Sequence, residues 1–245
     1  MNFPFWNQYE FLDSDLAIVL DKRLKIVSDR IENFFKNVVS TPLKEEYIEF
    51  YLAGSCLKRD TFRDIDLFFL TNEALHEVLD CIDKKYFLYK NNSHTFKFEN
   101  DIFQCVYRER FLNKNLKFVI DIFDFYSTKI GFKCRVNTKN FKLEVVESEV
   151  RKEFVLYMKK RYNHVTRINQ NPFVSLQRAI HFCKSGDDVP FHSFLDVILE
   201  IMKIDPVADY EKCFQRIQGD GQNYEAVKKA IEEFLEKRKE LEKRE

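Results

Sequence analysis

The chain of 245 residues carries 40 Lys and Arg against 40 Asp and Glu, a formal net charge of zero that argues against a wholly basic nucleic-acid coat protein. Five Gly and five Pro exclude collagen and long flexible linkers, and 26 Phe require a large aromatic core. No apolar run approaches the roughly 18 residues of a membrane-spanning helix, so no membrane partner is expected.

The six cysteines include no Cys-x-x-Cys pair and no Cys–His pair at zinc-binding spacing, so a structural zinc site is not expected. Residues 1–10 lack the basic and then apolar pattern of a signal peptide. We therefore expect a cytoplasmic protein whose cysteines are reduced and behave as small buried apolar side chains.

The N-terminal part of the chain alternates between helical and strand patterns. Apolar residues at helical spacing predict a helix over residues 15–39, and Pro42 ends the pattern. Thr71 can cap a second helix that runs to about Lys84. Short apolar runs predict strands over residues 47–53, 65–70, 86–90, 95–98, 102–107 and 116–125.

From about residue 148 onward the spacing becomes helical. Asn171 followed by Pro172 is a strong helix start, because it places a capping residue before Pro at the first helical position. The inner face of that helix is expected to consist of Phe173, Leu176, Ile180 and Cys183. Further helices are expected near residues 154–158, over 191–202 and over 224–245. We therefore predict an α+β domain over residues 1–145, followed by a helical domain over residues 146–245.

The segment from Leu52 to Phe69 carries the clearest chemical signal. Gly54 and Ser55 follow a strand, and Asp64 and Asp66 stand on either side of an apolar residue at the head of the next strand. Side chains two residues apart in a strand point to the same face, so the two carboxylates should lie side by side. Neighbouring carboxylates repel unless a cation lies between them, and oxygen ligands suit Mg²⁺ or Mn²⁺. Gly54 lets the backbone approach a phosphate, to which Ser55 can donate a hydrogen bond.

This pattern resembles the signature of the DNA polymerase beta-like nucleotidyltransferase superfamily, in which an apolar residue, Gly, and Gly or Ser precede a spacer and an Asp-apolar-Asp-apolar segment. The resemblance implies a mixed sheet with flanking helices and two metal ions that assist transfer of a nucleotidyl group from an NTP to a hydroxyl. It also implies a third carboxylate on a later apolar strand. Asp121 fits that description best, and Asp124 stays open as the alternative. The expected catalytic and metal-binding residues are thus Asp64, Asp66 and Asp121.

A second likeness, over about residues 45–185, is to the class II CCA-adding enzymes and bacterial poly(A) polymerases. Residues 58–60 are similar to the Arg-Asp stretch that precedes their Asp pair. Residues 122–128 resemble their Arg-Arg-Asp-Phe-Thr segment with the paired arginines missing, and residues 171–182 resemble the start of their neck helix. The substrate-binding residues that the two likenesses suggest are Gly54, Ser55, Lys58, Arg59, Arg63, Asp124 and Arg178.

The favoured acceptor is an RNA 3′ end, of the tRNA type first. Residues 108–184 hold 17 Lys and Arg against 7 Asp and Glu, a local excess that suits a polyanion. Because the paired arginines are missing, two other functions stay open. One is nucleotidylation of a protein or a small molecule, as toxins do, and the other is a non-catalytic relative that binds nucleotide or RNA. The sequence indicates no oligomeric state.

Overall fold

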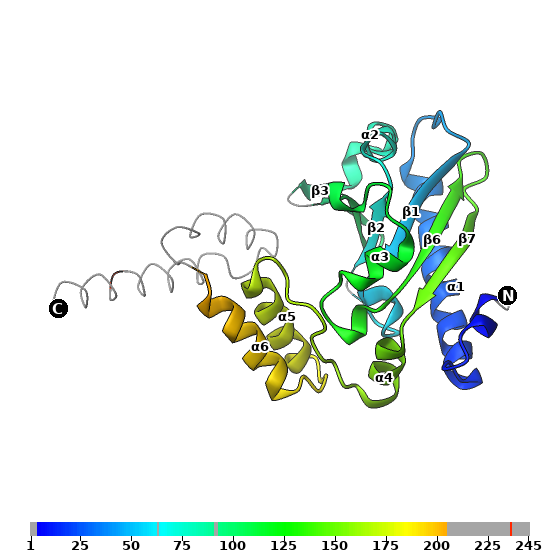
Figure 1. Cartoon of the computed structure of the whole chain (residues 1–245). Helices are drawn as coiled ribbons and strands as arrows, with labels where there is room; N and C mark the ends of the chain where they lie inside the picture. The colour runs from blue at the N-terminus through cyan, green and yellow to red at the C-terminus, as the bar shows by residue number, and fades with distance from the viewer. Residues whose placement is uncertain (1–3, 63, 91–92, 205–235, 237–245) are drawn as a thin grey trace. The chain divides into compact units, whose positions relative to one another are not determined.

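The computed structural model of the chain describes residues 4–62, 64–90, 93–204 and 236. It divides into two compact units between Arg167 and Ile168. The first unit is built around a seven-stranded mixed sheet, and the described part of the second is helical (Figure 1). The predicted α+β class is therefore confirmed.

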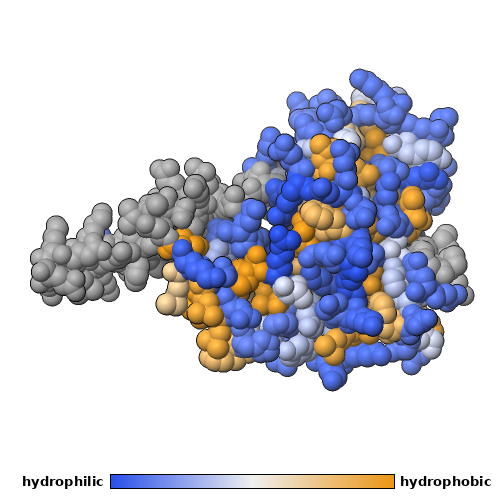
Figure 2. All heavy atoms as spheres, in the orientation of Figure 1, coloured by the Kyte–Doolittle hydropathy of each residue, from blue (hydrophilic) through white to orange (hydrophobic). Residues whose placement is uncertain are grey.

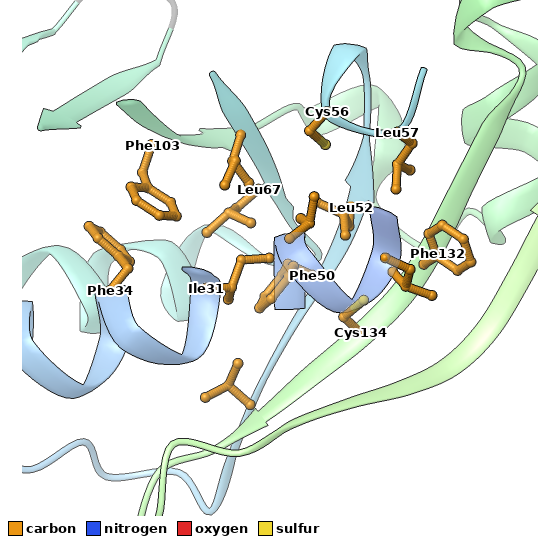
Figure 3. Close-up of a cluster of buried hydrophobic side chains, with 14 of the residues drawn as sticks. Ile31, Phe34, Phe50, Leu52, Cys56, Leu57, Leu67, Phe103, Phe132 and Cys134 are labelled. Carbon is orange, nitrogen blue, oxygen red and sulfur yellow. The ribbon is translucent and has the colours of Figure 1, made fainter. Parts of the chain in front are cut away.

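The first long helix, α1 (Ser14–Val38), packs on one face of the sheet and contributes its apolar face to the core. Asp13 caps it by accepting a hydrogen bond from the backbone N–H of Leu16. Leu24, Ile31 and Phe34 recur on its inner face with no exposed surface. The ring of Phe34 stacks on Phe103 of the sheet with 4.0 Å between centroids, and Figure 3 shows this contact beside Ile31 and Leu67. The helix expected over residues 15–39 is thus confirmed.

The order of the seven strands in the sheet differs from their order in the chain. They are β1 (Tyr47–Ala53), β2 (Ile65–Phe69), β3 (Phe87–Lys90), β4 (His94–Phe98), β5 (Asp101–Tyr107), β6 (Ile130–Asn137) and β7 (Leu143–Val150). Their order across the sheet is β3-β4-β5-β2-β1-β6-β7. β2 and β5 run parallel, and the remaining ladders are antiparallel. The helix between β2 and β3, α2 (Asn72–Cys81), is capped by Thr71 as expected.

The two faces of the sheet carry different layers. α1 and α2 bury their apolar side chains in the large core on one face. On the other face, α3 (Leu116–Asp121) packs Val119 and Ile120 against Tyr51 and Ala53 of β1 (Figure 1). Gly131 of β6 permits this contact, because a Cβ there would lie 2.5 Å from the Cδ1 atom of Ile120.

The strand expected over residues 116–125 is wrong, because this segment begins as α3. Leu116, Val119 and Ile120 are buried at i, i+3 and i+4, which is one face of a helix. Asn115 caps it by accepting from the backbone N–H of Phe118 at 2.9 Å. A continuous apolar run does not separate a buried strand from a short buried helix, and here tertiary packing decides for the helix.

The predicted domain boundary near residue 145 falls inside β7, and the structure places the division after Arg167 instead. β7 runs to Val150, so the helical pattern does not begin at residue 148. The following helix, α4 (Lys152–Lys160), buries Phe154 and Tyr157 in the core of the first unit. The division between the units therefore follows the packing of these elements, and not the change from strand-like to helical spacing of the apolar residues.

The second unit contains α5 (Pro172–Lys184) and α6 (Phe191–Met202), which pack on each other. Asn171 and Pro172 start α5 as predicted, but the inner face is different. The buried residues are Pro172, Ser175, Ala179 and Phe182, whereas Ile180 and Cys183 are exposed. α6 carries the exposed apolar side chains of Phe191, Leu195, Ile198, Leu199 and Met202. Figure 2 shows apolar surface in the region of this helix.

The helix expected over residues 224–245 lies outside the described residues, except for Glu236. Within the described ranges, none of the helices combines the length and apolar character needed to cross a membrane.

Candidate functional site

The site begins at the turn that ends β1. Gly54 has φ of 103° and ψ of −151°, a conformation that side chains disfavour. A Cβ at Gly54 would lie 2.8 Å from the Oδ2 atom of Asp66, so a side chain there would displace the carboxylate. Ser55 then opens the short 3₁₀ turn η2 (Ser55–Leu57), whose Cys56 and Leu57 are buried in the core (Figure 3). The Gly54 backbone therefore lies directly against a carboxylate.

Asp64 and Asp66 lie at the head of β2. Ile65 and Leu67 are fully buried in the core under α1, so the alternation of the strand directs Asp66 to the opposite face. Asp66 is opposite Ala53 of β1, next to the Gly54 turn. Asp64 immediately precedes the strand and is buried, with 7% of its surface exposed. The sequence prediction that Gly54, Ser55, Asp64 and Asp66 come together is therefore supported by direct contacts.

Hydrogen bonds hold both oxygens of the Asp64 carboxylate. Ser55 Oγ donates to Oδ1 at 3.3 Å, and Gln104 Nε2 donates to Oδ2 at 3.0 Å. Gln104 lies on β5 in register with Asp66, and its own Oε1 accepts from Ser93 Oγ at 3.3 Å. Two hydrogen bonds to one carboxylate restrict its rotamers. Asp64 is thus held in a defined orientation.

The two carboxylates also change the acidity of a neighbour. Burial raises the pKa of the Cys56 thiol well above its ordinary value, and the negative charges of Asp66 and Asp64 raise it further. Cys56 is therefore a neutral thiol near pH 7, as expected of a buried structural cysteine, and is not a nucleophile.

Asp121, the expected third ligand, lies elsewhere. It is the last residue of α3, it is exposed, and its two oxygens accept from Arg151 Nη2 at 2.6 and 2.7 Å. Among the described residues, no group of three or more His, Cys, Asp and Glu side chains is arranged to hold a metal ion. The predicted triad is therefore not assembled, because its third member stands on a helix. The strand beside β2 presents Gln104 instead.

Asp124, the alternative third ligand, follows α3 and is buried. It is 3% exposed, and its backbone carbonyl accepts from the N–H of Thr166 at 2.7 Å. Its charge and that of Asp121 act on Lys129, whose Nζ donates to the carbonyls of Ile120, Asp121 and Phe123 at 3.3, 2.9 and 2.5 Å. Both acidic candidates therefore belong to the surroundings of this buried lysine.

The predicted basic contacts have different positions. Lys58 and Arg59 directly follow η2, within the connection that joins Gly54 to Asp64; Lys58 is buried and Arg59 partly exposed. Arg63 lies outside the described residues. Arg178 lies on α5, in the second unit.

Sequence reasoning missed Gln104 and Ser93. Gln104 interrupts an apolar run in β5, and that polar residue was the available signal. Its role depends on the parallel pairing of β5 with β2, which joins segments about forty residues apart and leaves no local pattern.

The donor set is compatible with a divalent cation. Two carboxylates stand together with the Ser55 hydroxyl and the Gln104 amide beside them, and all four side chains carry oxygen. Mg²⁺ is commonly held by one or two carboxylates, with substrate phosphate oxygens and water completing its shell. The residues therefore fit an ion that is bound together with a phosphate-bearing substrate.

No protein-family model matches the chain, and no curated protein matches it significantly.

Proposed function

We propose that the protein is a metal-dependent nucleotidyltransferase with a polymerase-beta-like catalytic unit, which transfers a nucleoside monophosphate from an NTP to an acceptor hydroxyl. One observation carries the proposal. The Gly54 backbone turns directly against the Asp66 carboxylate, with Asp64 held beside it by Ser55 and Gln104. A turn that can approach phosphate thus adjoins a carboxylate pair that can hold a cation.

Asp64 and Asp66 would hold Mg²⁺ or Mn²⁺. When bound, such an ion would neutralise phosphate charge and lower the pKa of a hydroxyl group that it binds. Gln104 and Ser55 keep Asp64 in one orientation. Lys58 and Arg59, which lie in the same connection, offer positive charge to the triphosphate.

In the reaction, the acceptor hydroxyl oxygen forms a bond to the α-phosphorus, and the bond between that phosphorus and the bridging oxygen to the β-phosphate breaks. Pyrophosphate leaves with the electron pair of that bond, and the hydroxyl proton is released to solvent. Positioning and charge stabilisation are the contributions that such a transfer needs from a protein.

The acceptor that we favour is an RNA 3′ end. Exposed Lys114 and Lys117 stand just before and within α3, on the face of the sheet that also carries Asp66. Several other bases of residues 108–184 are paired with carboxylates, such as Lys133 with Glu49 and Arg135 with Glu144. The basic surface is therefore narrower than the composition predicts.

A non-catalytic nucleotide- or RNA-binding protein is the second candidate. It is favoured by the neutral Gln104 beside Asp66 and by the carboxylate pair without a third acid among the described residues. Such a protein would bind nucleotide or RNA and release no pyrophosphate.

A transfer assay separates these functions. The whole chain is given each α-labelled NTP with Mg²⁺ or Mn²⁺, total RNA and lysate protein. We expect label in RNA, and we expect its loss in Asp64→Asn and Asp66→Asn, since either change removes half of the anionic pair. Asp80→Asn, an exposed carboxylate on α2, is the matched control and should retain transfer.

Label in protein would redirect the proposal to protein nucleotidylation. Transfer that survives in both Asp64→Asn and Asp66→Asn would contradict the proposed site. Nucleotide binding without any transfer would favour the binding protein.

A further inference from the structure

A row of side chains crosses the sheet from the carboxylates to its edge. Asp66 on β2 is in register with Gln104 on β5, Gln104 with Thr95 on β4, and Thr95 with Tyr89 on β3. Residues that pair across strands share a face of the sheet. Tyr89 therefore stands on the face that carries Asp66, at the outermost strand.

An irregularity in β3 produces this placement. Phe87 is opposite Phe96, but Tyr89 is opposite Thr95, so Leu88 is an extra residue in β3. Phe87 packs its ring against Phe96, whose side chain lies in the core under α1. The extra residue moves Tyr89 to the opposite face, where 48% of its surface is exposed.

The neighbouring pair confirms the assignment of the faces. Lys90 is opposite His94, one step further along the ladder. Burial lowers the pKa of His94, and the positive charges of Lys90 and of His76 on α2 lower it further. Since α2 packs on the core face, Lys90 and His94 lie on that face and Tyr89 on the other.

The row forms a polar path that ends in an aromatic ring. Strands lie about 4.8 Å apart, so the backbones of Asp66 and Tyr89 are roughly 14 Å apart, a span on the scale of a nucleotide. Between them, Ser93 Oγ lies 3.3 Å from Gln104 Oε1 and 3.5 Å from Thr95 Oγ1. Thr95 is fully buried, and the partly exposed members of the row between the two ends are Ser93 and Gln104.

We propose that Tyr89 stacks on a nucleobase of the substrate whose phosphate lies at Asp64 and Asp66. This inference rests on the proposed function and names the base subsite of the same site. The Tyr89 ring is exposed on this face, and an exposed aromatic ring can bind unpaired nucleotides, because every base has a face on which a ring can stack. The base belongs either to the NTP or to the end of the acceptor strand.

Direct binding measurements on the whole chain test the subsite without requiring catalysis. The first probe is ATP with Ca²⁺, whose binding is measured by calorimetry. The second is a fluorescent single-stranded oligoadenylate, whose binding is measured by fluorescence anisotropy. The variants are Tyr89→Ala, Tyr89→Phe and, as a control, Leu88→Ala, whose side chain is similarly exposed on the same strand at 46%.

We expect Tyr89→Ala to weaken the binding of one probe by about 5- to 100-fold, the effect of losing one base–aromatic stack. Tyr89→Phe should bind like the unmodified chain, and so should Leu88→Ala. Weaker binding of ATP assigns the stack to the NTP, whereas weaker binding of the oligonucleotide assigns it to the acceptor.

Unchanged affinity of Tyr89→Ala for both probes, or no binding of either probe by the unmodified chain, would overturn the inference. An equal loss in Leu88→Ala or in Tyr89→Phe would also overturn it, since stacking depends on the ring alone. Tyr89-dependent binding by a chain that shows no transfer would refute the proposed catalysis and leave the base subsite standing.

Discussion

At the scale of single residues, Gly54 is the most constrained position of the site. Its positive φ strains any other residue, and a Cβ at this position, 2.8 Å from Asp66 Oδ2, would force the Asp66 carboxylate to move. We predict that Gly54→Ala lowers the free energy of unfolding by about 1–3 kcal/mol and displaces the Asp66 carboxylate, so that nucleotide transfer is lost. Urea unfolding and the transfer assay measure the two effects.

Gly186→Ala is the control for backbone strain alone. Gly186 also has a positive φ, of 79°, but a Cβ there meets nothing within 4 Å. Gly186→Ala should therefore lower the free energy of unfolding through backbone strain and retain nucleotide transfer. If both variants keep full activity, the contact between Gly54 and Asp66 is irrelevant to function.

Gln104 provides a second test at this scale. Gln104→Glu replaces the donor to Asp64 with a third carboxylate, and the resulting repulsion should lower the melting temperature in the absence of divalent ions. Mg²⁺ should then raise the melting temperature of Gln104→Glu more than that of the unmodified chain, because a bound cation relieves the repulsion. Thermal unfolding with Mg²⁺ and with EDTA measures this difference. An equal response of the two proteins to Mg²⁺ would argue against a cation at this position.

Part of the site could be predicted from sequence alone. Gly54, Ser55, Asp64 and Asp66 lie within one short segment, and the two-residue period of a strand is enough to bring the carboxylates together. Gln104 could not be predicted, because its contact with Asp64 depends on strand pairing between distant segments.

At the scale of elements, a buried lysine next to α3 makes the stability of the chain depend on pH. Lys129 is 4% exposed, and burial lowers its pKa to about 8, against an ordinary value of 10.5. Between these two values the unfolded chain binds more protons than the folded chain, so stability gains from this group as the pH rises from about 8 to 10.5. The cost of burying the charged lysine is fully present below pH 8.

We therefore predict that the difference in unfolding free energy between the unmodified chain and Lys129→Met changes with pH in this window, with a slope of at most about 1.4 kcal/mol per pH unit. Urea titrations at several pH values measure it. Lys133→Met, which removes a partly exposed lysine paired with Glu49, is the control for the loss of a lysine side chain. A pH-independent difference for Lys129→Met would contradict the lowered pKa.

α3 also shows why one expected strand was wrong. Residues 116–125 are apolar enough for either structure, and the helix is favoured because Leu116, Val119 and Ile120 then meet β1 on one face. The small residue that permits this packing, Gly131, lies on β6. A local pattern cannot carry that information.

At the scale of the whole molecule, the two faces of the sheet have different roles: one forms the core and the other carries the candidate site. The core on one face, under α1 and α2, contains most of the Phe side chains that are buried among the described residues. The other face carries the carboxylates, Gln104 and Tyr89. Residues 1–107 were predicted nearly strand by strand because their signals are local. β6 and β7 were not, since the pairing of β6 with β1 and of β7 with β6 extends the first unit beyond the change in sequence pattern.

The central claim is that Asp64 and Asp66 hold a divalent cation together with a nucleoside triphosphate. Electron paramagnetic resonance of Mn²⁺, titrated with the whole chain in the presence of ATP, tests this claim without knowledge of the acceptor. We predict that the unmodified chain and Asp80→Asn bind Mn²⁺ and ATP together, and that Asp66→Asn loses the ternary signal. Equal Mn²⁺ binding by all three proteins would contradict the claim.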